Sequence, residues 1–279
     1  MDMRRAYEDH EAANTLADEL RQPAQLWDTL TRKSALALFE GRFEEAEALI
    51  HEALRFGQLA QTANPQQAFD LQLYALRREQ GRLDEVIDVV RRAADDYPAY
   101  PIWRYVLPDA LAQLDRAEEA RAAFDDLAAE GFPEYGAGGE MQWLCSASLL
   151  PEVCRYLADV SRAATLYERL LPYAALNAVT PPEFIVGSVS RGLGILSAVQ
   201  SVWTDAVRHF EDAIDLNTRM KARPWLARTE HDFALMLLQR GEPDDSTRAA
   251  ELLSSAETSS RELGLNALGA EIAQLRVSR

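Results

Sequence analysis

The stretch DAVRHFEDAIDL, residues 205–216, decides the fold because the spacing of its apolar residues recurs along the chain. Ala206, Phe210 and Ala213 are four and three residues apart, which places them on one face of a helix. The same spacing recurs at Ala46/Ile50/Ala53, Val86/Val90/Ala93, Ala120/Phe124/Leu127, Ala163/Tyr167/Leu170 and Ala249/Leu253/Ala256. The first residues of successive sets are 40, 34, 43, 43 and 43 residues apart. The sequence therefore predicts an array of helical repeats.

Each repeat is predicted to hold two helices separated by a turn. Gly41, Gly81 and Gly241 lie between the two helices of their units, where glycine can adopt the left-handed conformation that ends a helix. The chain shows almost no alternation of the period expected for strands. Because a single helix pair cannot bury its apolar face, we expect the pairs to stack on their neighbours.

The repeats resemble the tetratricopeptide repeat. Leu193-Gly194 falls where that repeat has its Leu-Gly pair, and Pro108 and Pro151 occupy the equivalent position in the two preceding units. A proline inside a helix bends or breaks it, so the first helices of these two units are predicted to be bent. Repeats of 40–43 residues exceed the usual length, so we describe them as tetratricopeptide-like.

The predicted fold is all-α, a right-handed α-solenoid of tetratricopeptide-like helix pairs that forms one domain over residues 1–279. Residues 1–21 are expected to form an unpaired first helix, and residues 22–263 about six helix pairs. Residues 264–279 are expected to form a helix that caps the end of the stack.

Composition narrows the classes of partner. The formal charge of −16 repels phosphate backbones, so no nucleic-acid partner is expected. No apolar run approaches the roughly 18 residues of a membrane span, and the polar N-terminus does not resemble a signal peptide. The two cysteines, Cys145 and Cys154, lie nine residues apart in a predicted helix, on opposite faces. A cytoplasmic protein without membrane attachment is expected.

The sequence predicts no enzyme, cofactor or metal site. The histidines are His10, His51, His209 and His231, and none belongs to an H-E-x-x-H motif or a zinc-type Cys/His spacing. The paired acids Asp95-Asp96, Asp125-Asp126 and Asp244-Asp245 complete no aspartate-rich magnesium motif, and the chain has no phosphate-binding P-loop. His209 adjoins the packing residue Phe210 and is expected to point into solvent.

Candidate binding residues follow from the helical register. Counting back from Gly241, Arg228 and His231 occupy the second and fifth positions of a first helix, and Ser188 and Arg191 correspond to them one unit earlier. In tetratricopeptide arrays these positions line the concave groove, where arginine and histidine bind carboxylates or peptide backbone. The full set of groove candidates is Ser188, Arg191, Arg228, His231, Trp143, Trp225 and Tyr105. Alternatively, Trp225 packs between units and Arg228 pairs with Asp232.

Two longer segments resemble a known family. Residues 156–180 and 187–237, and most specifically 223–229 (RPWLART), resemble the C-terminal helical-repeat halves of bacterial AAA/STAND-type ATPase regulators. That family includes LuxR-type transcription activators and class III adenylyl cyclases. The resemblance implies a module that senses an inducer or partner and controls an ATPase half. This chain has no Walker motif, cyclase domain or helix-turn-helix, so no catalytic residue is carried over.

We therefore expect a non-catalytic scaffold or sensor that binds a protein or peptide in its concave groove, in bacterial signalling or transcription control. An ATPase or effector domain, of the same or another chain, is one expected partner. One alternative is a sensor of a small-molecule inducer, bound near the loops at 131–140 and 177–184. Another is a helical-repeat enzyme that uses His231 with nearby acids. A homodimer formed through the apolar surface near residues 12–20 is a further alternative.

Overall fold

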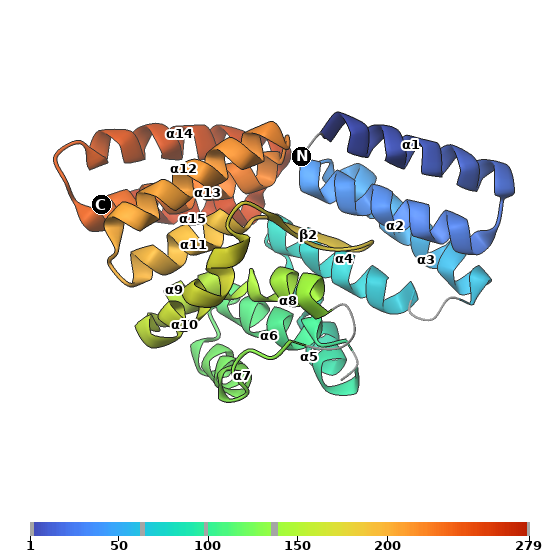
Figure 1. Cartoon of the computed structure of the whole chain (residues 1–279), viewed down its shortest axis with the longest axis horizontal. Coiled ribbons are helices and arrows are strands. Elements are labelled where there is room, and N and C mark those ends of the chain that lie inside the picture. Colours follow the sequence, from blue (N-terminus) through green and yellow to red (C-terminus); the bar gives the residue numbers. More distant parts are fainter. Residues whose placement is uncertain (1–2, 62–64, 98–99, 135–138, 278–279) are drawn as a thin grey trace.

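The chain is built mainly of helices, and most of them pack against the next helix in sequence (Figure 1). The computed structural model describes residues 3–61, 65–97, 100–134 and 139–277. The α-helices are α1 (Met3–Leu20), α2 (Pro23–Glu40), α3 (Phe43–Ala60), α4 (Pro65–Gln80), α5 (Ile87–Asp96), α6 (Ile102–Gln113), α7 (Ala117–Ala129), α8 (Gly139–Ala147), α9 (Leu150–Leu157), α10 (Val160–Leu170), α11 (Val189–Val199), α12 (Trp203–Arg219), α13 (Arg223–Arg240), α14 (Asp245–Leu263) and α15 (Asn266–Val277). Two strands, β1 (Asn177–Thr180) and β2 (Phe184–Ser188), lie between α10 and α11. None of the described helices is long and apolar enough to cross a membrane.

The recurring apolar spacing marks the buried face of every second helix. The spacing falls on α3, on residues 86–93 (which run into α5), and on α7, α10, α12 and α14. Each of these helices packs against the first helix of its pair, giving the pairs α2/α3, α4/α5, α6/α7, α9/α10, α11/α12 and α13/α14. All residues of the spacing are buried except Tyr167, which is half-buried. The predicted packing face is therefore confirmed. Its small residues allow the two helices to approach closely: a Cβ added at Gly194 of α11 would lie 2.9 Å from the ring of Phe210.

The two ends of the array meet. Helix α13 packs against α2, and α15 packs against α4 (Figure 1). Gly41, in the left-handed conformation at the end of α2, lies so close to α13 and α14 that an added Cβ would be 3.1 Å from both Pro224 and Leu263. The first helices of the pairs pack against one another, α2 against α4, α9 against α11, and α13 against both α11 and α2, and we call the side that they form the concave side. Their concave side is consequently enclosed by the chain itself.

Residues 177–188, which include the predicted irregular loop 177–184, form an antiparallel β-hairpin. Asn177 pairs with Ser188 and Thr180 with Phe184, with an irregularity between Ala178 and Val179. Strand β2 packs against α2, α4, α8, α11, α12 and α13. Because helices cover the strand on both faces, its side chains do not alternate between core and solvent. The expectation that strands are essentially absent is therefore corrected here.

The prolines and cysteines of the middle units also differ in detail from expectation. Pro108 lies inside α6, as predicted, but Pro151 lies in the first turn of α9, after α8 has ended at Ala147. The first helix of this unit is thus broken into two helices, because proline is tolerated in a first turn. Cys145 and Cys154 consequently belong to different helices, and both are buried free thiols. Burial raises the pKa of Cys145 to about 12.

Enlarging a residue of the apolar spacing should destabilise the fold. Ala120 is fully buried in α7, whereas Ala122 on the same helix is exposed. We expect Ala120→Leu to lower the free energy of unfolding by about 1–3 kcal/mol through overpacking. Ala122→Leu should change it by less than about 0.5 kcal/mol, because leucine and alanine have similar helix propensities. Urea unfolding followed by circular dichroism measures both. Equal effects of the two substitutions would contradict the assignment of the packing face.

Candidate functional site

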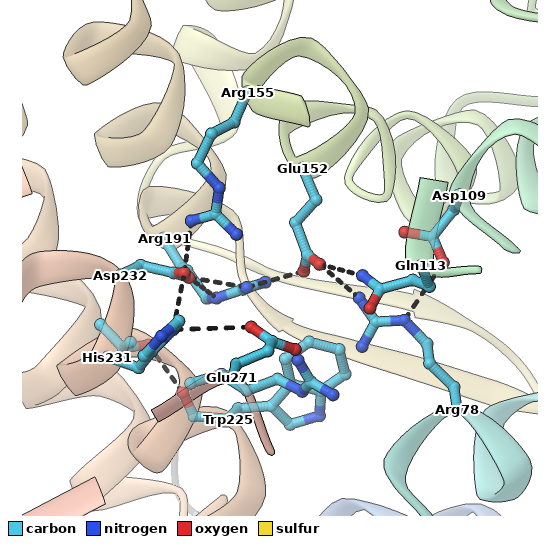
Figure 2. Close-up of polar contacts among 12 residues, drawn as sticks. Arg78, Asp109, Gln113, Glu152, Arg155, Arg191, Trp225, His231, Asp232 and Glu271 are labelled. Carbon is cyan, nitrogen blue, oxygen red and sulfur yellow. Dashed lines mark hydrogen bonds and ion pairs between the residues drawn. The ribbon is translucent and has the colours of Figure 1, made fainter. Parts of the chain in front are cut away.

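Charged side chains converge on the concave side of the array, and we call this group the concave cluster (Figure 2). Its members come from the first helices of the pairs and from α15. They are Arg78 and Glu79 of α4, Asp109 and Gln113 of α6, Glu152 and Arg155 of α9, Arg191 of α11, Arg228, His231 and Asp232 of α13, and Glu271 of α15. The cluster is buried except for the half-buried Gln113 and for one edge, where the side chains of Arg155 and Glu271 are 32% and 36% exposed.

Glu152 occupies the centre of the concave cluster. One carboxylate oxygen lies 2.8 Å from Nη2 of Arg78, and the other lies 2.7 Å from Nη2 of Arg191 (Figure 2). Gln113 donates a further hydrogen bond of 2.6 Å. Burial alone would raise the pKa of Glu152, but the two guanidinium groups outweigh it and lower the pKa below its usual range. This carboxylate is therefore ionised and shared between two arginines.

Two aspartates flank this centre in different electrostatic states. Asp232 accepts from Arg191 at 2.7 Å and from Arg155 at 2.5 Å. Burial raises its pKa, but these two arginines outweigh burial and hold the pKa well below the usual value. Asp109 lies 3.1 Å from Nε of Arg78 and accepts a hydrogen bond from the Tyr74 hydroxyl. There burial outweighs the arginine, and the pKa of Asp109 is raised.

Arg228 joins the last helix pair to the second. Its Nε lies 3.1 and 3.0 Å from the two carboxylate oxygens of Glu79, which belongs to α4, 149 residues earlier in the chain. The alternative pairing of Arg228 with Asp232 is therefore wrong, because closure of the array brings Glu79 to the guanidinium while Asp232 pairs with other arginines. Nη2 of Arg228 is buried without a hydrogen-bond partner among the described residues.

Three of the predicted groove candidates meet in the concave cluster. Arg191, Arg228 and His231 are only 4%, 2% and 3% exposed. Nδ1 of His231 lies 3.5 Å from Asp232 and 3.8 Å from Glu271. Trp225 belongs to the same region, with the guanidinium carbon of Arg191 5.6 Å from the centre of its ring. The register thus places these residues on one face, and the structure surrounds them with carboxylates.

The other candidates lie elsewhere. Ser188 ends β2 and is buried, and its hydroxyl has no hydrogen-bond partner among the described residues. The indole nitrogen of Trp143 donates to the carbonyl of Phe132 at 3.0 Å, and the Tyr105 hydroxyl donates to the carbonyl of Pro133 at 2.8 Å. Trp143 and Tyr105 therefore hold the segment after α7.

Sequence reasoning missed the acidic half of the cluster. Asp109 and Glu152 are 43 residues apart, each directly after the proline of its unit, so they occupy equivalent positions in successive repeats. That equivalence was a usable signal. His209 is also corrected: it is fully buried, with Nε2 3.1 Å from the Tyr167 hydroxyl. Burial, followed by the nearby Arg208, lowers the pKa of His209 to about 4.

The charges of the concave cluster are paired within the chain. Four buried or edge arginines face four buried carboxylates, so the charges of the core of the cluster balance. In the part of the chain that the structure describes, no group of three or more histidine, cysteine, aspartate or glutamate side chains could hold a metal ion. No protein-family model, curated protein or solved structure matches this chain.

The β-hairpin lies beside the concave cluster and fills the rest of the concave side. The Gln72 amide donates to the carbonyl of Glu183 at 3.0 Å and to that of Thr31 at 2.8 Å. Phe184 packs edge-on against Tyr74, with ring centres 6.4 Å apart. The Glu183 side chain is buried and makes no ion pair with any described residue. Burial therefore raises its pKa to about 7.

Removing the charge of Glu152 should destabilise the protein strongly. Glu152→Gln leaves the two buried guanidinium groups of Arg78 and Arg191 without their shared counter-ion. We expect a loss of about 3 kcal/mol in the free energy of unfolding at pH 7. Glu168→Gln, at an exposed position of α10, is the matched control and should have little effect. Urea unfolding measures both, and a Glu152→Gln protein as stable as the control would show that the cluster carries no such constraint.

Glu183 should make stability depend on pH. Its pKa rises from 4.5 to about 7 in the folded protein, so its favourable contribution is complete below pH 4.5 and is lost as pH rises through 7. Glu183→Gln removes this loss. We expect the variant to exceed the wild type in free energy of unfolding by about 2–3 kcal/mol at pH 8 and to match it near pH 4.5. Urea unfolding at both pH values tests this, and a difference independent of pH would refute it.

Proposed function

We propose that this protein is a non-catalytic binding module that engages a protein or peptide through its concave side. In this proposal the helix pairs form a right-handed, tetratricopeptide-like solenoid. The resemblance to AAA/STAND-type regulators supports a role in bacterial signalling or transcription control, with an ATPase or effector domain as one candidate partner. The observation that carries the proposal is the convergence of Arg155, Arg191, Arg228 and His231 on one enclosed face.

The exposed edge of the concave cluster is the proposed point of contact. Arg155 and Glu271 reach solvent there, and His231 lies directly behind Glu271. A carboxylate of the partner, such as its C-terminus, can take the place of Glu271 and bind Arg155 in charge-assisted hydrogen bonds. The surrounding surface is acidic, with a formal charge of −16, and favours an otherwise basic or apolar segment.

The proposal is tested by partner capture followed by affinity measurement. Proteins retained by the immobilised chain are identified by mass spectrometry, and their affinity is measured by isothermal titration calorimetry. We expect Arg155→Ala to weaken binding at least tenfold, because it removes the exposed cation of the cluster. Arg219→Ala is the control, since Arg219 lies on the exposed face of α12. Circular dichroism shows that each variant is folded.

If Arg155→Ala and Arg191→Lys both bind the partner as tightly as the wild type does, the partner-binding site does not lie on the concave side. If Arg219→Ala lowers the affinity for the partner instead, the interface lies on the outer helices.

A small-molecule sensor is the second candidate, supported by a pocket of about 320 Å³ between α1, α2 and the hairpin. Its lining includes His10, Arg32, Leu36, Pro181 and Phe184. This volume lies at the lower end of the range for ligand pockets. Of the loops expected to frame such a site, 177–184 contributes to the pocket, whereas residues 135–138 of the other lie outside the described residues. A ligand-dependent rise in melting temperature without a protein partner would favour this candidate.

A further inference from the structure

The hairpin is seated like a ligand on the concave side. Strand β2 packs against α2, α4, α8, α11 and α13, which are first helices of their units, and also against α12. In Figure 1 the strands cross the middle of the molecule, between α2 and α4 on one side and α11 on the other. An extended segment that contacts the inner helices of an array occupies the place of a peptide in a helical-repeat groove.

We call the surface that the hairpin covers the seat; it includes Gln72 and Tyr74 of α4 and Trp225 of α13. Its side-chain contacts are of the kind that select a sequence. A Cβ added at Gly187 would lie 2.7 Å from the ring of Trp225, so the indole excludes every larger residue. Phe184 is buried against Tyr74, and Gln72 binds the backbone carbonyl of Glu183. The face therefore accepts an extended segment with an aromatic residue and, three positions later, a glycine.

The hairpin leaves small cavities and unpartnered polar atoms on the surface that it covers. Cavities of about 20 Å³ and 10 Å³ remain beside Glu183, and the smaller one is lined by Gln67 and Trp103. Oε1 of Gln67 and Nε1 of Trp103 are buried without hydrogen-bond partners among the described residues. Buried polar atoms without partners cost free energy, and the carboxyl of Glu183, which is buried without an ion pair to any described residue, adds to that cost. A segment with a side-chain amide or hydroxyl at this point would fit better.

We propose that the concave side is a docking surface for an extended peptide segment of the partner, and that the hairpin Asn177–Ser188 is its built-in occupant, displaced when that segment binds. This proposal rests on the proposed function and names the class of partner. The segment is extended, carries an aromatic residue at the Phe184 position and glycine at the Gly187 position, and offers an amide or hydroxyl near Gln67. The tether keeps the hairpin at a high effective concentration, so its release controls binding.

A complementation experiment tests whether the seat accepts a segment from outside. The probe is a fluorescein-labelled synthetic peptide with the sequence of residues 176–190, measured by fluorescence anisotropy. Gly187→Ala should unseat the tethered hairpin, and the peptide supplies the glycine that the variant lacks. We expect the peptide to bind Gly187→Ala at least tenfold more tightly than the wild type. Gly241→Ala is the matched control, because Gly241 also has a positive φ but nothing within 4 Å of an added Cβ.

A covalent lock tests whether the peptide takes the place of the hairpin. Cys145 belongs to α8, which packs against β1, and its thiol lies beside Thr180 of that strand, so Thr180→Cys places a second thiol close to it. In the Thr180→Cys/Gly187→Ala protein, we expect the reduced form to bind the peptide and the oxidised, disulfide-linked form to bind at least tenfold more weakly. Adding Cys145→Ser removes the disulfide and should abolish the effect of oxidation.

Three results would overturn the docking surface: a folded Gly187→Ala protein that does not bind the peptide, equal binding by oxidised and reduced forms, or Gly241→Ala behaving like Gly187→Ala. If Gly187→Ala is unfolded, Phe184→Ala is the milder variant, and failure of the peptide to raise its melting temperature is equally decisive. If these results hold while Arg155→Ala leaves partner affinity unchanged, the seat stands and the contact at the cluster edge fails. If Arg155→Ala weakens partner binding but the peptide does not displace the hairpin, the proposed function stands and the docking of an extended segment in place of the hairpin is refuted.

Discussion

The ion pair between Arg228 and Glu79 is the contact on which the closed form of this protein depends. It joins α13 to α4 across 149 residues of chain, at the place where the last helix pair meets the second. Both side chains are buried, so neither charge can be left unpaired without a large cost in free energy. The concave side is therefore an interior, and its charged groups are paired mainly with one another.

The rest of the concave cluster follows from that enclosure. A buried ion pair is weak evidence for stability in itself, because desolvation consumes most of the Coulomb attraction. Such an ion pair instead fixes the relative placement of helices: Glu152 can bind Arg78 and Arg191 together only when α4, α9 and α11 have one arrangement. Apolar contacts between helices tolerate sliding, whereas paired charges do not. The cluster thus sets the curvature that apolar packing between neighbouring pairs leaves open.

Because the concave side is enclosed, the position of the hairpin decides which surfaces of the inner helices are accessible. An open array would present its inner helices to a partner, but here β2 already covers them, while the cluster reaches solvent at Arg155 and Glu271. The binding proposed for this side therefore couples to the position of the hairpin. Glu183, buried without a counter-ion, weakens that seat as pH rises. In the proposed mechanism, release of the hairpin switches the module.

The sequence by itself determined most of the helices and which residues share a face, because the apolar spacing and the turn glycines act within one or two helical turns. It also placed Arg191, Arg228 and His231 on the inner helices by register. Only the tertiary structure decided that the ends meet, that Glu79 pairs with Arg228, and that residues 177–188 form a strand pair inside the curve. Closure depends on small rotations between successive pairs that accumulate along the array, and no local pattern encodes their sum. A strand covered on both faces shows no alternation, so its contacts with distant helices, rather than its own sequence, specify it.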